Sequence, residues 1–177
     1  MPENESSPTS SAGAGSCPDC GAPASGGRAG CQALFDELAA QAFTDLRYAP
    51  VYMLAFDTYC MQHPNTYCRS AKSYAAHLTR LCCGLEHTGS PEIYAAIQRW
   101  LSGTVDIEKP ATLSHRGSMT VADMRAARNV EDHKRLVRDW ARSVWEAYAP
   151  QHEIARNWIE AALLPTSYSH LLKRTDR

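Results

Sequence analysis

Apolar side chains recur at three- and four-residue spacing through most of the chain, which is the periodicity of amphipathic α-helices. The first such helix is predicted over 31–43. Proline and serine residues then delimit further helices, which we predict over 50–61, 70–86, 91–101, 120–128, 130–148 and 150–164. We find no convincing two-residue alternation of the kind that β-strands show. The pattern therefore predicts an all-α fold, an irregular bundle of six to seven helices with mostly antiparallel neighbours.

The segments outside this pattern suggest one domain with loose ends. Residues 1–16 consist largely of Ser, Pro, Gly, Ala and Glu without an aromatic residue, so we expect a disordered tail there. The folded domain is expected over 17–164 and a loose carboxyl-terminal tail over 165–177. Inside the domain, 102–118 is the longest connection, and long loops are often functional, so a lid over a site is one interpretation.

Composition and charge narrow the classes of function. The chain has 177 residues, of which 44% are hydrophobic, enough for one domain with a core. Its 18 Lys and Arg almost balance 19 Asp and Glu, so we do not expect a nucleic-acid partner. The chain lacks a run of 18 apolar residues, and residues 1–16 contain two Glu but no Lys or Arg. We therefore expect neither a membrane span nor a secretory signal. We expect the protein to be cytoplasmic.

Seven cysteines in such a chain are expected to be metal ligands or free thiols rather than disulfides. Cys17-Pro-Asp-Cys20-Gly21 has the spacing of a zinc knuckle, in which two thiolates in a tight turn face one cation. Cys31 follows at the predicted start of a helix, where the helix dipole favours a thiolate. The alternative is that Cys17 and Cys20 form a redox pair or are idle thiols, with Cys31 a small buried residue.

A structural zinc site needs a fourth ligand. The first two predicted helices have similar lengths and a short connection, so they should run antiparallel, with the end of the second beside the start of the first. His63 lies at that end, and we predict a zinc site of Cys17, Cys20, Cys31 and His63. Cys60 and Cys68 are the alternatives for the fourth position.

Asp57 and His77 each interrupt the apolar stripe of a predicted helix. If these two helices pack as an antiparallel hairpin about residue 67, the two side chains lie opposite each other. A buried carboxylate is costly unless it is paired, so a core pair that sets the hairpin register is one interpretation. The other is a catalytic acid/base pair or a second metal site.

The predicted start of the third helix carries Ser70, Lys72 and Ser73, which together with exposed backbone amides could bind an anion. Cys68 lies just before it, next to Arg69, which could lower the pKa of the thiol. A serine N-cap with solvated charges explains the same residues without a ligand, and we favour that interpretation.

Several motifs occur together in a characteristic order. They are Cys17-Pro-Asp-Cys20-Gly, Cys31-Gln-Ala-Leu-Phe-Asp, Gln62-His63-Pro64, Ser70-Ala-Lys-Ser-Tyr-Ala-Ala-His77-Leu and Thr120-Val-Ala-Asp123, followed by Trp140 and Trp145. In this order the chain resembles, over about residues 17–160, a family of small bacterial proteins of unknown function. The resemblance implies a bacterial, cytoplasmic protein with a single helical domain, and it supplies no catalytic residues.

Two classes of function follow from these features. The first is a zinc-binding helical protein whose metal is structural and which acts as a binding or adaptor module for a protein or small-molecule partner. The second is a metal- or thiol-dependent enzyme in which Asp57 and His77, with Lys72 or Cys68, line a pocket beside the zinc. A cavity that reaches Asp57 and His77 would favour the enzyme, and a sealed pair would favour the module.

Overall fold

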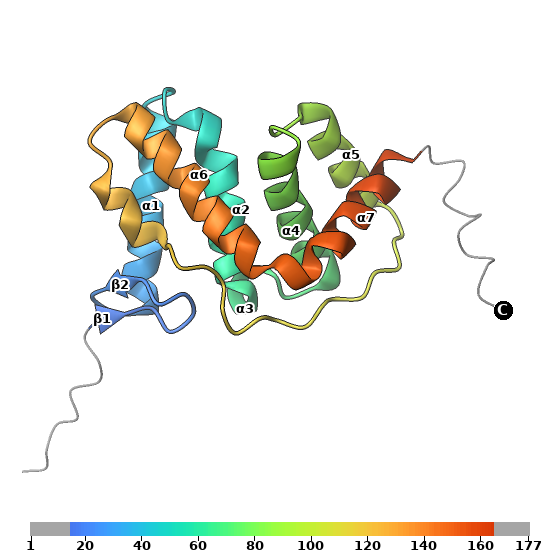
Figure 1. Ribbon diagram of the computed structural model, residues 1–177, viewed down its shortest axis with the longest axis horizontal. Helices are drawn as coiled ribbons and strands as arrows, with labels where there is room; N and C mark the ends of the chain where they lie inside the picture. The colour runs from blue at the N-terminus through green and yellow to red at the C-terminus, as the bar shows by residue number, and fades with distance from the viewer. Residues whose placement is uncertain (1–14, 165–177) are drawn as a thin grey trace, which may run out of the picture.

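The computed structural model describes residues 15–164, and helices make up most of this part of the chain (Figure 1). The predictions for 1–14 and 165–177 lie outside the described residues. The α-helices are α1 (Arg28–Thr44), α2 (Tyr52–Gln62), α3 (Pro64–Tyr67), α4 (Ala71–Glu86), α5 (Pro91–Ser102), α6 (Val130–Ala147) and α7 (His152–Leu163). Short 3₁₀ helices are η1 (Ala49–Val51), η2 (Val121–Ala126) and η3 (Ala149–Gln151). The all-α prediction is confirmed.

The element boundaries differ from the predictions in four places. Helix α1 begins at Arg28, one turn before Cys31, and the short helix α3 lies between the helices predicted over 50–61 and 70–86. The helix expected over 120–128 is the 3₁₀ helix η2. A two-residue antiparallel ladder joins β1 (Gly15–Ser16) to β2 (Pro23–Ala24), where no strand was predicted. Two-residue strands are too short to show an alternating pattern.

Two groups of helices lie side by side (Figure 1). Helices α1, α2 and α6 form one group, and α4, α5 and α7 form the other. The groups meet where α2 packs against α4, and η3 carries the chain from α6 into α7. The core contains Trp140, Tyr148, Tyr74, Leu78 and Met61, all less than 2% exposed. This packing leaves the β1–β2 segment at one end, beside the start of α1.

The long connection from α5 to η2 runs along one side of the molecule and is held by side chains from three helices. Lys72 donates to the carbonyl of Gly103 (2.8 Å), and Gln151 donates to that of Ala111 (2.9 Å). Gln62 donates to the carbonyls of Arg116 (3.0 Å) and Met119 (2.8 Å). The connection is therefore held near both ends and at Ala111, and a lid that opened would have to break these bonds.

Within residues 15–164 no helix combines the length and the apolar character that crossing a bilayer requires.

Candidate metal centre

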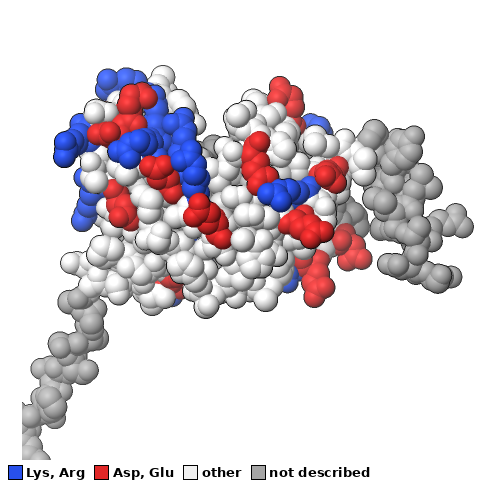
Figure 2. Space-filling model, viewed as in Figure 1, with Lys and Arg blue, Asp and Glu red and all other residues white. Residues whose placement is uncertain are grey.

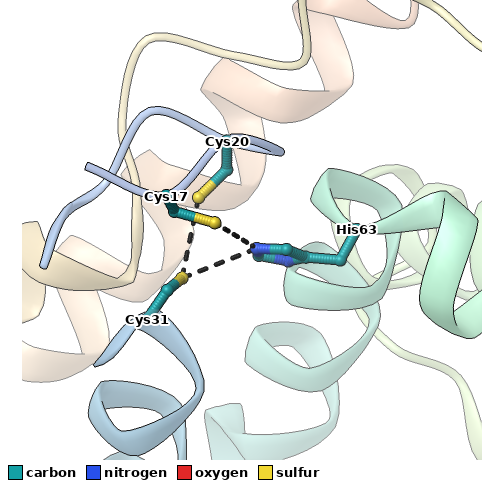
Figure 3. Close-up of side chains that lie close together, drawn as sticks. All are labelled: Cys17, Cys20, Cys31 and His63. Atoms are coloured by element: carbon teal, nitrogen blue, oxygen red, sulfur yellow. Dashed lines mark hydrogen bonds between the residues drawn. The ribbon is translucent and has the colours of Figure 1, made fainter. Parts of the chain in front are cut away.

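The β1–β2 segment is a compact turn around Cys17 and Cys20. The amide of Cys17 donates to the carbonyl of Ala22, and the amide of Gly21 donates to that of Cys17, both at 2.8 Å. Gly21 has a φ of +78°, which is the conformation that glycine adopts without strain. The turn thereby directs both sulfur atoms toward the start of α1 (Figure 3).

Helix α1 brings Cys31 against this turn. Gly30 permits the close approach, because a Cβ at this position would meet the carbonyl oxygen of Ser25 at 1.9 Å. Arg28 then fixes the orientation, since its guanidinium donates to both carboxylate oxygens of Asp19 (2.6 and 3.1 Å). Hydrogen bonds from Arg28 are the main cause of the lowered pKa of Asp19.

His63 lies between α2 and α3 and points its ring at the sulfur atoms (Figure 3). Its Nδ1 lies 2.7 Å from the carbonyl oxygen of Tyr59, and a carbonyl only accepts. The neutral ring therefore carries its proton on Nδ1, which leaves the lone pair of Nε2 facing the cysteines. The ring of Tyr59 lies against that of His63, with centroids 4.1 Å apart, and adds a second restraint.

The four side chains converge on one point. Nε2 of His63 lies 3.5 Å from Sγ of Cys17 and 3.5 Å from Sγ of Cys31, and Sγ of Cys20 lies 3.7 Å from Sγ of Cys31. All four ligand atoms lie within 4.8 Å of one another, so the cluster could hold a metal ion. The structure thus brings together the residues that the sequence predicts as ligands.

The alternatives for the fourth position point elsewhere. Sγ of Cys68 donates to the carbonyl of Cys60 (3.6 Å) and lies 3.9 Å from Sδ of Met61. Cys60 and Cys68 are both fully buried, and burial is the main cause of their raised pKa values. The pKa of Cys68 is raised to about 12. Neither residue belongs to the group of ligand atoms around His63.

The protein environment favours neutral thiols at Cys17 and Cys20. The hydrogen bond with Cys31, followed by burial, raises the pKa of Cys20 to about 12, and burial raises that of Cys17. A thiolate there needs a positive charge beside it, which a divalent cation would supply. Three soft sulfur donors and one imidazole are a ligand set for a soft or borderline metal.

Gln62 and Arg116 support the cluster, a role that was not predicted from the sequence. The amide of Gln62 is fully buried; its oxygen accepts from the indole of Trp140 (3.0 Å), while its nitrogen donates to the long connection. The guanidinium of Arg116 donates to the carbonyls of Asp19 (2.6 Å) and Gln62 (3.3 Å). The position of Gln62 beside His63 in the Gln-His-Pro motif was the available signal.

The predicted pair of Asp57 and His77 also meets. Nδ1 of His77 lies 2.9 Å from Oδ1 of Asp57, and Nε of Arg80 lies 3.3 Å from Oδ2, which has no hydrogen bond of good geometry. Burial raises the pKa of Asp57, against the effect of His77 and Arg80. The carboxylate is fully buried, whereas the His77 side chain is 12% exposed.

The predicted anion site is occupied by internal hydrogen bonds. Ser70 is the N-cap of α4, and its hydroxyl accepts from the amide of Ser73 (3.0 Å). The hydroxyl of Ser73 accepts from the amide of Ser70 in return (3.0 Å), which forms a capping box. The ammonium of Lys72 reaches Gly103. This arrangement favours the N-cap interpretation.

A second group of potential ligands, Cys82, Glu86 and His87, lies at the end of α4. Arg156 donates to both carboxylate oxygens of Glu86 (2.7 and 2.8 Å), and the indole of Trp145 donates to one of them (3.0 Å). These bonds use three of the four lone-pair sites of the carboxylate and place a positive charge beside it. We therefore regard this group as an ion pair rather than a second metal centre.

The fold and the cluster define an all-helical protein with a Cys₃His site that could hold a metal ion. Residues 15–149 match a family of unknown function, DUF5946, and the chain belongs to this family. The match includes all four residues of the cluster and ends before α7. No curated protein and no solved structure matches the chain.

Proposed function

We propose that this protein is a helical binding module whose amino-terminal segment is ordered by a structural zinc ion. The distances within the cluster carry this proposal. A tetrahedral zinc with Zn–S of about 2.3 Å and Zn–N of about 2.0 Å separates two sulfur atoms by about 3.8 Å and sulfur from nitrogen by about 3.5 Å. Here Sγ of Cys20 and Sγ of Cys31 lie 3.7 Å apart, and Nε2 of His63 lies 3.5 Å from Sγ of Cys17 and from Sγ of Cys31.

The ligand count supports a structural role. Catalytic zinc sites use three protein ligands and keep one position for water or substrate, whereas structural sites have four. Cys17, Cys31 and His63 are at most 1% exposed, so little room remains for a substrate. The backbone carbonyl that holds Nδ1 of His63 is the kind of outer partner that fixes a ligating imidazole.

The zinc would compensate for a weak local core. The segment from Gly15 to Gly27 is rich in glycine and proline, and two-residue strands contribute few backbone hydrogen bonds. Zinc binding in small domains contributes on the order of 10 kcal/mol to folding. One ion would therefore link this segment to α1 and to the end of α2.

The experiment is metal analysis of purified protein and of two matched variants. We expect one zinc per chain in the wild type and in Cys68→Ser, and loss of zinc in Cys20→Ser. Cys68 is the control because it is also a buried cysteine and was an alternative ligand. Wild-type protein that is folded without metal, or equal metal content in Cys20→Ser and wild type, would overturn the zinc assignment.

The enzyme with an Asp57 and His77 site is the second candidate, supported by their hydrogen bond of 2.9 Å. Neither residue lines the cleft of about 660 Å³ between the helix groups or the smaller one of about 340 Å³. The raised pKa of Cys68, about 12, also makes it a poor nucleophile at neutral pH. The module with a protein or small-molecule partner is therefore better supported.

A further inference from the structure

One cleft lies between the two helix groups, away from the metal cluster. Figure 2 shows it as a notch between two raised parts of the surface, with basic side chains gathered on the wall formed by α6. Its volume is about 660 Å³, within the range of small-molecule sites, about 300–1,000 Å³. Residues from η1, α2, α4, α5 and α6 line it.

The α6 wall presents two guanidiniums one helical turn apart, those of Arg138 and Arg142. Arg142 also donates to Asp139 (2.9 Å). Arg138 makes no ion pair within residues 15–164, and its one hydrogen bond there is a long one of 3.5 Å to the carbonyl of Lys134. Two such groups side by side match the oxygens of a carboxylate, sulfonate or phosphate.

The lining also contains two carboxylates, those of Glu86 and Glu146. Glu86 is paired with Arg156, as described above, and its pKa is lowered to about 2 mainly by that pair. Glu146 is the other acidic residue of the lining. Among the charged groups of the lining, Arg142 and Glu86 each have an ion-pair partner outside it, whereas Arg138 and Glu146 have none among the described residues.

The floor of the cleft is apolar and rigid. Val51, Leu54 and Leu85 line it together with the indole of Trp145. Trp145 is held on two sides, because its Nε1 donates to Glu86 (3.0 Å) and its ring stacks on that of His152 at 3.8 Å. A preformed aromatic surface binds an apolar group at a low cost in conformational entropy.

The rim contains an unusual backbone conformation. Thr88 has a φ of +53° and is the one non-glycine residue between 15 and 164 with a positive φ. For a β-branched residue this conformation is strained, and such strain clusters at ligand sites. Tyr94, whose hydroxyl makes no hydrogen bond within the described chain, lines the cleft close to this turn.

We propose that this cleft binds a small organic anion with an apolar body, its acidic group on Arg138 and Arg142 and its apolar part against Trp145, Leu54 and Leu85. A free small molecule and a membrane lipid could both present an acidic group next to an apolar body. We assign the cleft to a free small molecule. The cleft shares no residue with the metal cluster, so this proposal and the zinc assignment fail separately.

The test uses two fluorescent probes that differ by one acidic group. 8-Anilinonaphthalene-1-sulfonate carries a sulfonate, and N-phenyl-1-naphthylamine is the same aromatic frame without it. Titrated into the full-length protein, the sulfonate probe is expected to saturate one site and to bind at least tenfold more tightly than the neutral probe. Equal affinity for both probes, or a signal that does not saturate, would overturn the proposal without any variant.

Matched double variants then locate the site. Arg138→Ala with Arg142→Ala should weaken the sulfonate probe at least tenfold, whereas Lys134→Ala with Arg135→Ala, which removes the same charge from α6 outside the cleft, should change it less than twofold. Near-ultraviolet circular dichroism checks that each variant is folded, and Arg138→Gln alone replaces the first double variant if that protein does not fold. Equal losses in both pairs would indicate general charge attraction and reject the site.

Sedimentation with phosphatidylglycerol vesicles distinguishes a free small molecule from a membrane lipid as the ligand of the cleft. We expect the wild type to stay in the supernatant at physiological salt. Sedimentation that depends on Arg138 and Arg142 would instead assign the cleft to a membrane lipid and overturn the proposal of a free small molecule.

Discussion

The metal cluster and the pair of Asp57 with His77 are two buried histidine sites that differ in how their polar atoms are satisfied. At the cluster, the Nδ1 atom of His63 bonds to a backbone carbonyl, and its Nε2 faces three sulfur atoms around one point. At the pair, Nδ1 of His77 faces a carboxylate that Arg80 also approaches. The first arrangement leaves donor atoms directed at a common centre, whereas the second uses protein groups as partners for one another.

This difference distinguishes a ligand site from a structural ion pair. Atoms that bind one metal converge on a common centre, and at the cluster three pairs of donor atoms lie 3.5 to 3.7 Å apart, close to the separations in a tetrahedral zinc site. Atoms of a structural pair lie at hydrogen-bond distance, as the 2.9 Å between His77 and Asp57 shows. Both sites contain buried ionisable groups, so burial alone does not separate them.

The largest effect is expected on removing the metal. A chelator should lower the melting temperature by more than 10 °C, because zinc can contribute on the order of 10 kcal/mol to folding and because folded protein binds it better than unfolded chain. Circular dichroism during heating, with and without chelator, measures the shift, and one equivalent of zinc should reverse it. A melting temperature that chelation leaves unchanged would show that the cluster does not depend on a metal.

The next largest effect is expected on replacing Asp57, the buried partner of His77. Asp57→Ala leaves His77 and Arg80 beside a buried cavity without an acceptor, and we expect a loss of about 3–5 kcal/mol in the free energy of unfolding. Urea denaturation measures it, with Asp106→Ala, an exposed position, as a control that should change by less than about 0.5 kcal/mol.

Metal analysis of the Asp57→Ala variant tests whether the metal cluster and the Asp57–His77 pair are independent. We expect its zinc content to equal that of the wild type, since Asp57 is not among the four clustered ligands. Loss of the metal in this variant, at a temperature where it remains folded, would mean that the two sites are one functional unit and would revive the enzyme interpretation.

The smallest effect concerns a carboxylate near the surface. The pKa of Glu86 is lowered from 4.5 to about 2, mainly by its hydrogen bonds with Arg156, so this pair stabilises the fold above pH 4.5 and loses its effect as the pH falls toward 2. Because the pair is partly exposed, we expect Glu86→Gln to cost about 1 kcal/mol at pH 7.

The pH dependence of this cost is the measurement. The difference in unfolding free energy between wild type and Glu86→Gln, from urea titrations at several pH values, should shrink below pH 4.5. A difference that stays constant between pH 7 and pH 3.5 would contradict the lowered pKa of Glu86.

Much of the metal centre could be predicted from residue types and spacing. The spacing of Cys17 and Cys20 indicates a tight turn with two soft donors, and Gly21 permits that turn. His63 followed from treating the first two helices as an antiparallel hairpin. The supporting roles of Gln62 and Arg116 could not be predicted, because their partners lie 54 to 97 positions away in the chain.

The helical periodicity and its main interruptions can be read from the sequence, since apolar spacing and proline act within a few residues. Packing sets the features that depend on partners far apart in the chain. Side chains of Lys72, Gln62 and Gln151 hold the 102–118 connection by hydrogen bonds to its backbone. Five separate elements together form the cleft. Local propensity determines where the helices form. Contacts between residues far apart in the chain determine the cleft and the site that those helices enclose.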